Sequence, residues 1–468
     1  MAGVLCIFLP CMQLKFKPRH LTICLSIGLA VKASRSFAQV EDTAGYRHEF
    51  YREDNDRMSI DTDTLGFDIG LGEHVRLTGL LVQDAISGAT PTGAPPQNQW
   101  PFQTLNGYYN QTYNQLFQAA INDRNNYQLY TDGYFATNAN PYQAYTNYIA
   151  TNNPQLGPQA SNNAAAAYQN QSTNKNLHNT TVPLTQLHDF RRAFTLGTPI
   201  TFGIHQFTPQ VAVSMEHDYH SYGTALNYAA LLNKKNTTLN AGWSHDCDRV
   251  RDSSYIWEGK VSDDFLIGIN QLLTPKSYIT FDFTYGQEYG YLDDPYRAVM
   301  PLLNFPQPNP DDAALLLEKR PRRRTKEIFY TAYSQFIDPL SGSAEVGYRF
   351  FHDSYGIFGH TFETSWHQKI GRYLVFTPAF RYYFQTAANF YYIMVPDYNN
   401  LPAYYSADYR LSELQTFNFS ATLSYRVLKH LSIDLGYTRY IMQGLDGATS
   451  QSAYPSANVY TVGGRIWF

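Results

Sequence analysis

The sequence predicts an all-β fold, namely a transmembrane antiparallel up-and-down β-barrel of about 16 strands with short periplasmic turns and long external loops. Three observations lead to this prediction. Apolar and polar residues alternate with a period of two along many segments, short connections alternate with long ones, and the chain stops on an aromatic residue that ends such a segment. A period of two with one apolar face is the pattern of a half-buried strand.

The composition agrees with a membrane protein that crosses the bilayer with strands. The chain of 468 residues is 16% aromatic, with 39 Tyr and 29 Phe, and 16% charged, against about a quarter charged in soluble domains. Mean hydropathy is -0.39, and no apolar run after the N-terminal segment reaches the roughly 20 residues of a spanning helix. Only helices and closed barrels satisfy the hydrogen bonds of every backbone group in lipid. Because no spanning helix is expected, a barrel is the remaining structure. The net charge of -4 gives no indication of nucleic-acid binding.

The segment 1–38 is predicted to be a signal peptide that is removed on export, and Met12 is an alternative start of the chain. A basic region, an apolar stretch too short to cross a bilayer and two small residues follow one another as in such signals: Lys15, Lys17, Arg19 and His20, then 21–31, then Ser36 and Ala38. Cleavage after Ala38 leaves the barrel at 39–468. Three of the four cysteines are lost with the signal, so no internal disulfide is expected.

The strands are expected to run from Tyr46 to Phe468, and the alternation is clearest over 417–427 and 431–437. Tyr and Phe near the strand ends match the aromatic girdles on either side of a lipid-facing band. The pattern alone also allows a water-soluble β-sandwich, in which the apolar face would pack on a core. The connection lengths favour the barrel, because a sandwich has no reason to place its short turns at one end.

Short periplasmic turns are predicted at seven places: 72–73, 198–199, 233–236, 274–276, 338–342, 371–372 and 428–430. Between them lie connections that are often much longer, including 87–185, 288–324, 386–409 and 444–457. Counting the strands up and down gives about sixteen, and an even number places both termini in the periplasm.

The last predicted strand carries the most specific local signal. Apolar residues alternate along it to the final residue: Tyr460, Val462, Gly464, Ile466 and Phe468. A terminal aromatic residue that closes an amphipathic strand resembles the signal read by the outer-membrane assembly machinery. We therefore predict this machinery as a partner, and the bacterial outer membrane, with its lipid and lipopolysaccharide, as the location.

The segment 89–185 has a different composition and no alternation. It is rich in Tyr, Asn, Gln, Ala and Pro, and its charged residues are few: Asp123, Arg124, Asp132 and Lys175. Short helices are expected at 110–122 and 164–168. A loop of this length is usually functional or disordered. The interpretations are a constriction inside the barrel, an external cap that binds partners, and a partly disordered hydrophilic insertion.

Several short segments spread along the mature chain form a recognisable set: YREDNDRM at 51–58, DAISGATP at 84–91, FTPQV at 207–211, KNTTL at 235–239, GYLDDPYR at 290–297, and RYYFQ at 381–385 with Ala387, Ala388 and Phe390. They resemble a bacterial family of uncharacterised outer-membrane barrel proteins, catalogued as domain of unknown function 3570. The resemblance covers nearly the whole mature chain except the 89–185 insertion. It implies an outer-membrane barrel and no established activity.

Strand parity assigns an interior face to the barrel. If the apolar residues face lipid, the alternate positions point into the lumen, and seven charged residues are expected there: Asp282, Glu345, Arg349, Arg381, Arg426, Asp434 and Arg465. Charges belong inside, because an Arg or Lys on the lipid face would cost roughly 2–4 kcal/mol near the midplane. The mixed signs fit either a pore without strong ion selectivity or a lumen closed by salt bridges.

The residue pattern indicates no catalytic set, no cofactor and no metal centre. Two acidic groups in external loops are candidates for a calcium site, because hard divalent cations prefer oxygen ligands: Asp54 and Asp56, and Asp293 and Asp294. The alternative is that these loops are solvated and paired with neighbouring arginines. A basic run in another external loop suits lipopolysaccharide phosphates, or is solvated without a partner: Arg320, Arg322, Arg323, Arg324 and Lys326.

These observations predict a passive pore or transport component for small solutes, since a barrel of 16–18 strands is wide enough for a water-filled channel unless loops block it. The alternative is a non-enzymatic surface adhesin, or a structural sheath for a partner in the envelope, motivated by the uncharged insertion. An enzyme is not expected, although barrel-embedded hydrolases exist. Association into a homo-oligomer is compatible with the same pattern.

Overall fold

The computed structural model describes residues 41–94, 101–123, 126, 141–172, 181–301, 315–395 and 400–468. The predicted signal peptide at 1–38 and its cleavage site lie outside the described residues. Among the described residues, no helix combines the length and the apolar character needed to cross a membrane.

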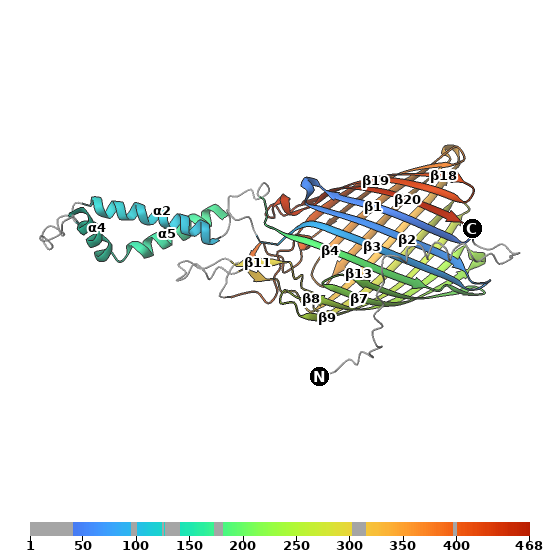
Figure 1. The fold of residues 1–468 in the computed structure, drawn as a ribbon, viewed down its shortest axis with the longest axis horizontal. Helices are drawn as coiled ribbons and strands as arrows, with labels where there is room; N and C mark the ends of the chain where they lie inside the picture. Colours follow the sequence, from blue (N-terminus) through green and yellow to red (C-terminus); the bar gives the residue numbers. More distant parts are fainter. Residues whose placement is uncertain are drawn as a thin grey trace, which may run out of the picture. The chain divides into compact units, whose positions relative to one another are not determined.

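Sixteen long antiparallel strands among the described residues form one closed sheet (Figure 1). β1 (Thr43–Glu53) pairs on one side with β2 (Met58–Gly70) and on the other with β20 (Ser456–Trp467), so the first and last strands close the ring. The other long strands follow in chain order: β3 (Arg76–Pro91), β4 (Leu184–Gly197), β6 (His205–Met215), β7 (Tyr219–Leu232), β8 (Thr237–Arg251), β9 (Trp257–Thr274), β10 (Ser277–Gly290), β13 (Arg323–Ile337), β14 (Gly342–Asp353), β15 (Phe358–Ile370), β16 (Leu374–Gln385), β18 (Leu414–Leu428) and β19 (Leu431–Gly444). The predicted fold class and strand number are confirmed.

Six of the seven predicted short turns join neighbouring strands at one end of the barrel. The tightest of them link β9 to β10 over residues 275–276 and β18 to β19 over residues 429–430. At the other end, the connections from β10 to β13 and from β16 to β18 are long. The two ends therefore differ in the way that outer-membrane barrels do, with short periplasmic turns and long external loops.

The turn predicted at 198–199 is wrong. Thr198 and Pro199 interrupt the strand for two residues, after which the short β5 (Ile200–Phe202) continues along the same partner, β6. The turn itself lies at 203–204, where Gly203 has a φ of 60°. Pro199 has no N–H group to donate to a neighbouring strand, so it breaks the ladder locally, and the sequence pattern does not distinguish such a break from a turn.

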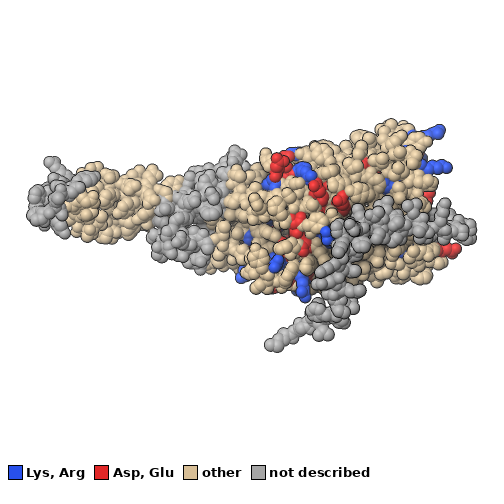
Figure 2. Space-filling model, in the orientation of Figure 1, with Lys and Arg blue, Asp and Glu red and all other residues tan. Residues whose placement is uncertain are grey.

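The outer face of the barrel is apolar. Large apolar side chains at alternate strand positions are exposed around it, such as Val346 at 58% and Ile267 at 63%. Arg349, three residues along β14 from Val346, faces the other way and lines a cavity inside the barrel. In Figure 2 charged side chains gather mainly over the half of the barrel nearest the long loops. Exposed apolar surface of this extent marks a face that contacts lipid.

The long external loops pack on one another at the mouth of the barrel (Figure 1). Short strands from two of these loops form a separate three-stranded sheet: β11 (Ala298–Pro301), β12 (Leu316–Leu317) and β17 (Met394–Val395). Val299 and Val395 of this sheet have no exposed surface, and they pack with Tyr405 and Ala407. The external loops therefore have an apolar core of their own.

The insertion between β3 and β4 spans 92–183, slightly less than the predicted 89–185. Its described residues form three helices: α2 (Pro101–Asn122), α4 (Pro141–Asn152) and α5 (Leu156–Ser172). Ile149 of α4 is fully buried against aromatic side chains of α2, where Tyr113 and Phe117 stack with ring centroids 5.9 Å apart. The helices expected at 110–122 and 164–168 lie within α2 and α5. α4 was not predicted, because its Tyr, Thr and Ile residues favour strands when considered alone.

Candidate functional site

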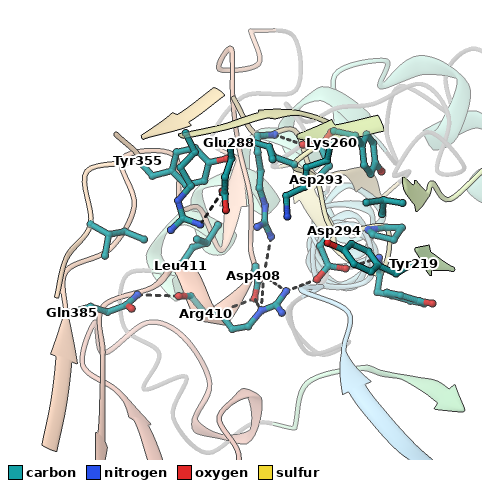
Figure 3. Close-up of a pocket in the computed structure, with 18 of the residues that line it drawn as sticks. Tyr219, Lys260, Glu288, Asp293, Asp294, Tyr355, Gln385, Asp408, Arg410 and Leu411 are labelled. Atoms are coloured by element: carbon teal, nitrogen blue, oxygen red, sulfur yellow. Dashed lines mark hydrogen bonds and ion pairs between the residues drawn. The ribbon is translucent and has the colours of Figure 1, made fainter. Parts of the chain in front are cut away.

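The candidate site is a cavity of about 910 Å³ inside the barrel. Side chains of β3, β4, β7 to β10 and β13 to β16 form its walls, and residues of short external turns and of two long external loops reach into it (Figure 3). The volume lies within the range of roughly 300–1,000 Å³ that is usual for small-molecule sites. Charged side chains of both signs line the cavity. Among the described residues, acidic residues without a close cation lie on one wall, and the arginine without a close carboxylate lies on another.

One side of the cavity, here called the acidic wall, consists of Asp189 on β4 and of Glu216 and Asp218 in the turn between β6 and β7. Their carboxylate oxygens lie within 4.8 Å of one another, close enough to share one cation. The backbone N–H of Phe190 donates to Asp189 at 2.6 Å. Arg191 is the nearest counter-charge, with its Nε 4.0 Å from Glu216 Oε1.

Burial, together with the charges of the neighbouring Asp189 and Asp218, raises the pKa of Glu216 to about 7, although Arg191 opposes the shift. With a pKa of about 7, the Glu216 carboxyl is protonated below neutral pH and ionised above it. The charge of the acidic wall therefore changes by one unit across neutral pH.

A second side of the cavity, here called the basic wall, carries positive charge. It consists of Arg349 on β14 and Arg381 on β16. The Arg349 guanidinium stands over the Tyr330 ring, 5.4 Å from its centroid, and that of Arg381 stands 5.8 Å from the centroid of Tyr383. Arg381 Nε also lies 3.8 Å from a carboxylate oxygen of Glu363. In the part of the chain that the structure describes, no carboxylate lies within 4.0 Å of the Arg349 guanidinium.

The loops above the cavity are joined by Asp408, whose side chain is only 1% exposed. Arg410 Nε donates to it at 2.9 Å and an Arg320 nitrogen at 2.8 Å, while Arg297 Nε lies 3.8 Å away. Burial alone would raise the pKa of Asp408, but these three guanidiniums hold it well below its usual range. Asp408 therefore stays ionised as the shared anion of two buried cations, Arg297 and Arg320, and of the half-exposed Arg410.

This arrangement, here called the roof cluster, ties together two loops that are distant in sequence. Arg320 belongs to the segment before β13, whereas Asp408 and Arg410 precede β18. Arg410 also donates to Asp294 (Figure 3). Ser406 donates to the buried Glu318 at 2.5 Å. Breaking a buried ion pair by removing one partner is strongly destabilising, so the roof cluster is expected to hold the two loops in place.

Three of the four calcium candidates, Asp54, Asp293 and Asp294, have arginine partners in the structure. Arg439 donates to both oxygens of Asp54, at 2.7 and 2.6 Å, and this contact lowers the pKa of Asp54. Asp294 is bound by Arg410, and Asp293 accepts the backbone N–H of Arg320 at 2.5 Å. Asp56 lies with Asp54 in the 3-10 turn η2 (Asp54–Asp56).

The carboxylates that the structure does bring together, among the described residues, are those of the acidic wall. Sequence reasoning missed them, because Asp189 lies 27 positions before Glu216 and no motif links the two. Strand parity is the signal that could have found them, since Asp189 occupies an inward position of β4 and the other two follow in the next short external turn.

Two of the seven predicted lumen residues, Arg349 and Arg381, line the cavity. Asp282 is paired in register with Tyr330, which is also paired with Arg349, so these side chains share one face of the sheet. Glu345 accepts a hydrogen bond from Tyr278 at 3.2 Å, outside the cavity.

The remaining three predicted lumen residues lie elsewhere on the wall. Ser432 on β19 is paired in register with both Arg426 on β18 and Arg465 on β20, which places these side chains on one face of the sheet. Asp434 lies two residues after Ser432 on β19 and shares this face. Arg426 alternates with Tyr425 and Val427, which are exposed on the outer side. The structure thus brings Arg349 and Arg381 together and keeps the group on β18 to β20 apart from them.

The basic run is divided between the two sides of the barrel. Arg320 belongs to the roof cluster, Arg324 is 2.5 Å from Asp353, and Lys326 donates to Glu288 at 2.8 Å. Arg323 stands over the Tyr289 ring at 5.3 Å. Because strand residues alternate between faces, Arg323 lies on the outer side, where a membrane surface would meet it.

A closed sixteen-stranded barrel with an apolar outer face and a charged lumen defines an outer-membrane β-barrel protein. A family model described as Protein of unknown function (DUF3570) matches residues 28–255 and 253–462. The chain belongs to this family, as its sequence resemblance predicted. A search of curated proteins finds no match to the chain.

The chain is similar to solved structures of low sequence identity. The siderophore receptor PirA from Pseudomonas aeruginosa is 9% identical, with a TM-score of 0.38 over 92% of this chain and 62% of that chain. CdiB from Acinetobacter baumannii is 7% identical, with a TM-score of 0.45 over 92% and 61%. OccK5 (OpdH) from Pseudomonas aeruginosa is 7% identical, with a TM-score of 0.37 over 92% and 98%. The chain spans about three fifths of the PirA and CdiB chains.

Asp408→Asn is expected to loosen the roof without opening the barrel. The substitution keeps the shape of the side chain but removes the anion shared by the buried Arg297 and Arg320 and the half-exposed Arg410. Glu318 and Asp294 remain as partners, so the cost is at most about 3–5 kcal/mol. Limited trypsin digestion of the folded protein should then cut near Arg320 and Arg410, while the barrel strands stay protected. Asp338→Asn is the control, since its pair with Lys276 is exposed and worth at most about 1 kcal/mol. Equal protection of the two variants would contradict the role of the roof cluster.

The charge of the acidic wall is expected to follow pH through Glu216. Its pKa is raised from 4.5 to about 7, so it is mostly protonated at about pH 6 and mostly ionised at about pH 8. Raising the pH adds a negative charge and should raise the permeability ratio of K⁺ over Cl⁻, measured from reversal potentials under a KCl gradient. Glu216→Gln should remove this rise and Glu49→Gln should keep it. A rise of the same size in Glu216→Gln would show that another group is responsible.

Proposed function

We propose that this protein is a passive pore for small solutes in the bacterial outer membrane. The observation that carries the proposal is the charged cavity inside a closed barrel of sixteen strands. Barrels of 16–18 strands enclose an aqueous channel when loops do not block them. A polar lumen beside an apolar outer face is the arrangement expected of a wall that separates water from lipid.

The space inside the barrel supports a route for solutes. Tyr278 on β10 is 41% exposed and Leu80 on β3 is 42% exposed, although both occupy inward positions of their strands. Their exposure indicates open volume in the part of the lumen that they line. The external loops narrow the lumen around the cavity of about 910 Å³, which fits solutes of small-molecule size rather than folded chains.

Export and assembly are part of the same proposal. A signal peptide cleaved after Ala38 would direct the chain across the inner membrane, and the strand that ends in Phe468 would be recognised by the assembly machinery. The apolar outer face supports contact with lipid, and Arg323 on the outer side supports contact with the phosphates of lipopolysaccharide.

A second function is favoured by one observation on the insertion. α2, α4 and α5 contain no Asp, Glu, Lys or Arg, and they expose Asn and Gln side chains. An uncharged helical surface of this kind suits a surface adhesin or a sheath for an envelope partner. Deletion of the insertion separates the two functions, because it would abolish binding of a partner and leave a pore open.

The pore is tested by recording single channels in planar bilayers with the wild-type protein and with a variant in which 95–180 is replaced by a short Gly-Ser linker. Discrete conductance steps are expected from both, because the strands and the cavity are unchanged by the deletion. A silent wild type with a conducting deletion variant would identify the insertion as a plug. Absence of steps from both variants would overturn the proposal.

A further inference from the structure

The two charged walls of the cavity lie on opposite sides of the barrel. Asp189 is on β4 and Arg349 is on β14, seven strands further round a ring of sixteen, and Arg381 on β16 is nine strands further. Eight strands would be diametrically opposite, so the two arginines flank the point that faces Asp189. All three line one cavity, so they also lie at a similar depth in the lumen.

Most of the charges between the two walls have close partners of opposite charge, whereas Asp293, which lines the cavity, accepts the backbone N–H of Arg320. Glu288 accepts a hydrogen bond from Lys326 at 2.8 Å, and Lys260 Nζ lies 3.5 Å from Asp248. In the roof cluster the carboxylates are likewise shared among arginines. These groups contribute little net field across the lumen.

The acidic wall has an excess of negative charge. Its nearest guanidinium, Arg191, is bound to the buried Asp84 at 2.5 Å and only approaches Glu216 at 4.0 Å. Tyr296 donates a hydrogen bond to Asp218 and adds no charge. Asp189 and Asp218 therefore face the cavity without a cation of their own among the described residues.

The basic wall keeps donors available to a ligand. A guanidinium held over an aromatic ring is positioned through its planar face, which leaves the N–H groups at its edge free to donate. Tyr330 holds Arg349 in this way and Tyr383 holds Arg381. A carboxylate that enters the cavity can accept from such an edge with two hydrogen bonds.

We propose that the cavity selects solutes that carry a carboxylate at one end and an ammonium group at the other, with several bonds between them, as in short peptides. The inference rests on the pore function and names its substrate class. Opposed charges inside a low-dielectric ring produce a field across the lumen. A solute with both charges is stabilised at both walls when it lies along this field, whereas a singly charged solute is attracted by one wall and repelled by the other.

The size of the barrel favours separated charges. Sixteen strands about 4.8 Å apart and tilted by about 40° enclose a ring on the order of 30 Å across between backbones. Side chains and loop residues such as Tyr296 narrow this width. The charges of a free α-amino acid are too close together to approach both walls, whereas the terminal charges of an extended tripeptide lie about 10 Å apart and come nearer to both.

The test measures entry of four peptides of one length into proteoliposomes: triglycine, N-acetyl-triglycine, triglycine amide and N-acetyl-triglycine amide. They are zwitterionic, anionic, cationic and neutral, in that order. Wild-type protein is expected to admit triglycine at least about threefold faster than the neutral peptide, the scale of two weak exposed ion pairs. Arg349→Gln/Arg381→Gln should remove this preference and favour the cation, and Asp189→Asn/Asp218→Asn should remove it and favour the anion.

The matched control is Arg47→Gln/Glu49→Gln, which removes a 3.1 Å ion pair from β1, away from the cavity, and should keep the preference. The single variants Arg349→Gln and Asp218→Asn serve where a double variant fails to fold, as judged by its heat-dependent mobility on gels. Entry of the neutral peptide without any preference for triglycine would overturn this inference and leave the pore standing. Exclusion of all four peptides by a protein that gives conductance steps would also overturn this inference, whereas absence of steps would overturn the pore function.

Discussion

The structure depends on one constraint, which is that no backbone N–H or C=O group can be left unpaired where the chain is surrounded by hydrocarbon. Pairing of β1 with β20 meets this constraint, since it removes the two free edges that an open sheet of the same strands would have. Once the ring is closed, every strand has one face toward lipid and one toward the lumen. The alternation of side chains then places most large apolar residues on the outer face, where charged residues such as Arg52 on β1 and Asp61 on β2 are paired with each other.

Because the strands form a closed wall, the loops alone shape the two ends of the barrel. At the external end the loops build a small apolar core and the roof cluster around Asp408. Buried charges are stable only when they are paired, and the roof cluster satisfies its carboxylates and most of its guanidiniums internally. In the acidic and basic walls, Asp189, Asp218 and Arg349 have no counter-ion within 4.0 Å among the described residues. The charges of the roof cluster therefore hold the loops in place, whereas those of the two walls remain available to a solute.

The parts of the structure that follow from periodicity could be predicted from the sequence. The parity that assigned Arg349 and Arg381 to the lumen, and the alternation of short and long connections, depend only on neighbouring residues. The turn at 198–199 could not be placed correctly, because Pro199 breaks a ladder in the same way as a turn does.

The acidic wall and the roof cluster could not be predicted either. Asp189 meets Glu216, and Arg320 meets Asp408, only through the register of strands that are distant in sequence. Loop residues of this kind carry no period that would reveal their partners.

The central claim is that the apolar side of each strand faces lipid and the charged side faces water. Thiol labelling along β14 tests it most directly, with single cysteines at Glu345, Val346, Tyr348 and Arg349 in a Cys247→Ser background reconstituted in vesicles. A water-soluble maleimide should react at 345 and 349 and leave 346 and 348 unmodified. Equal reaction at all four positions, or the reverse alternation, would contradict the account.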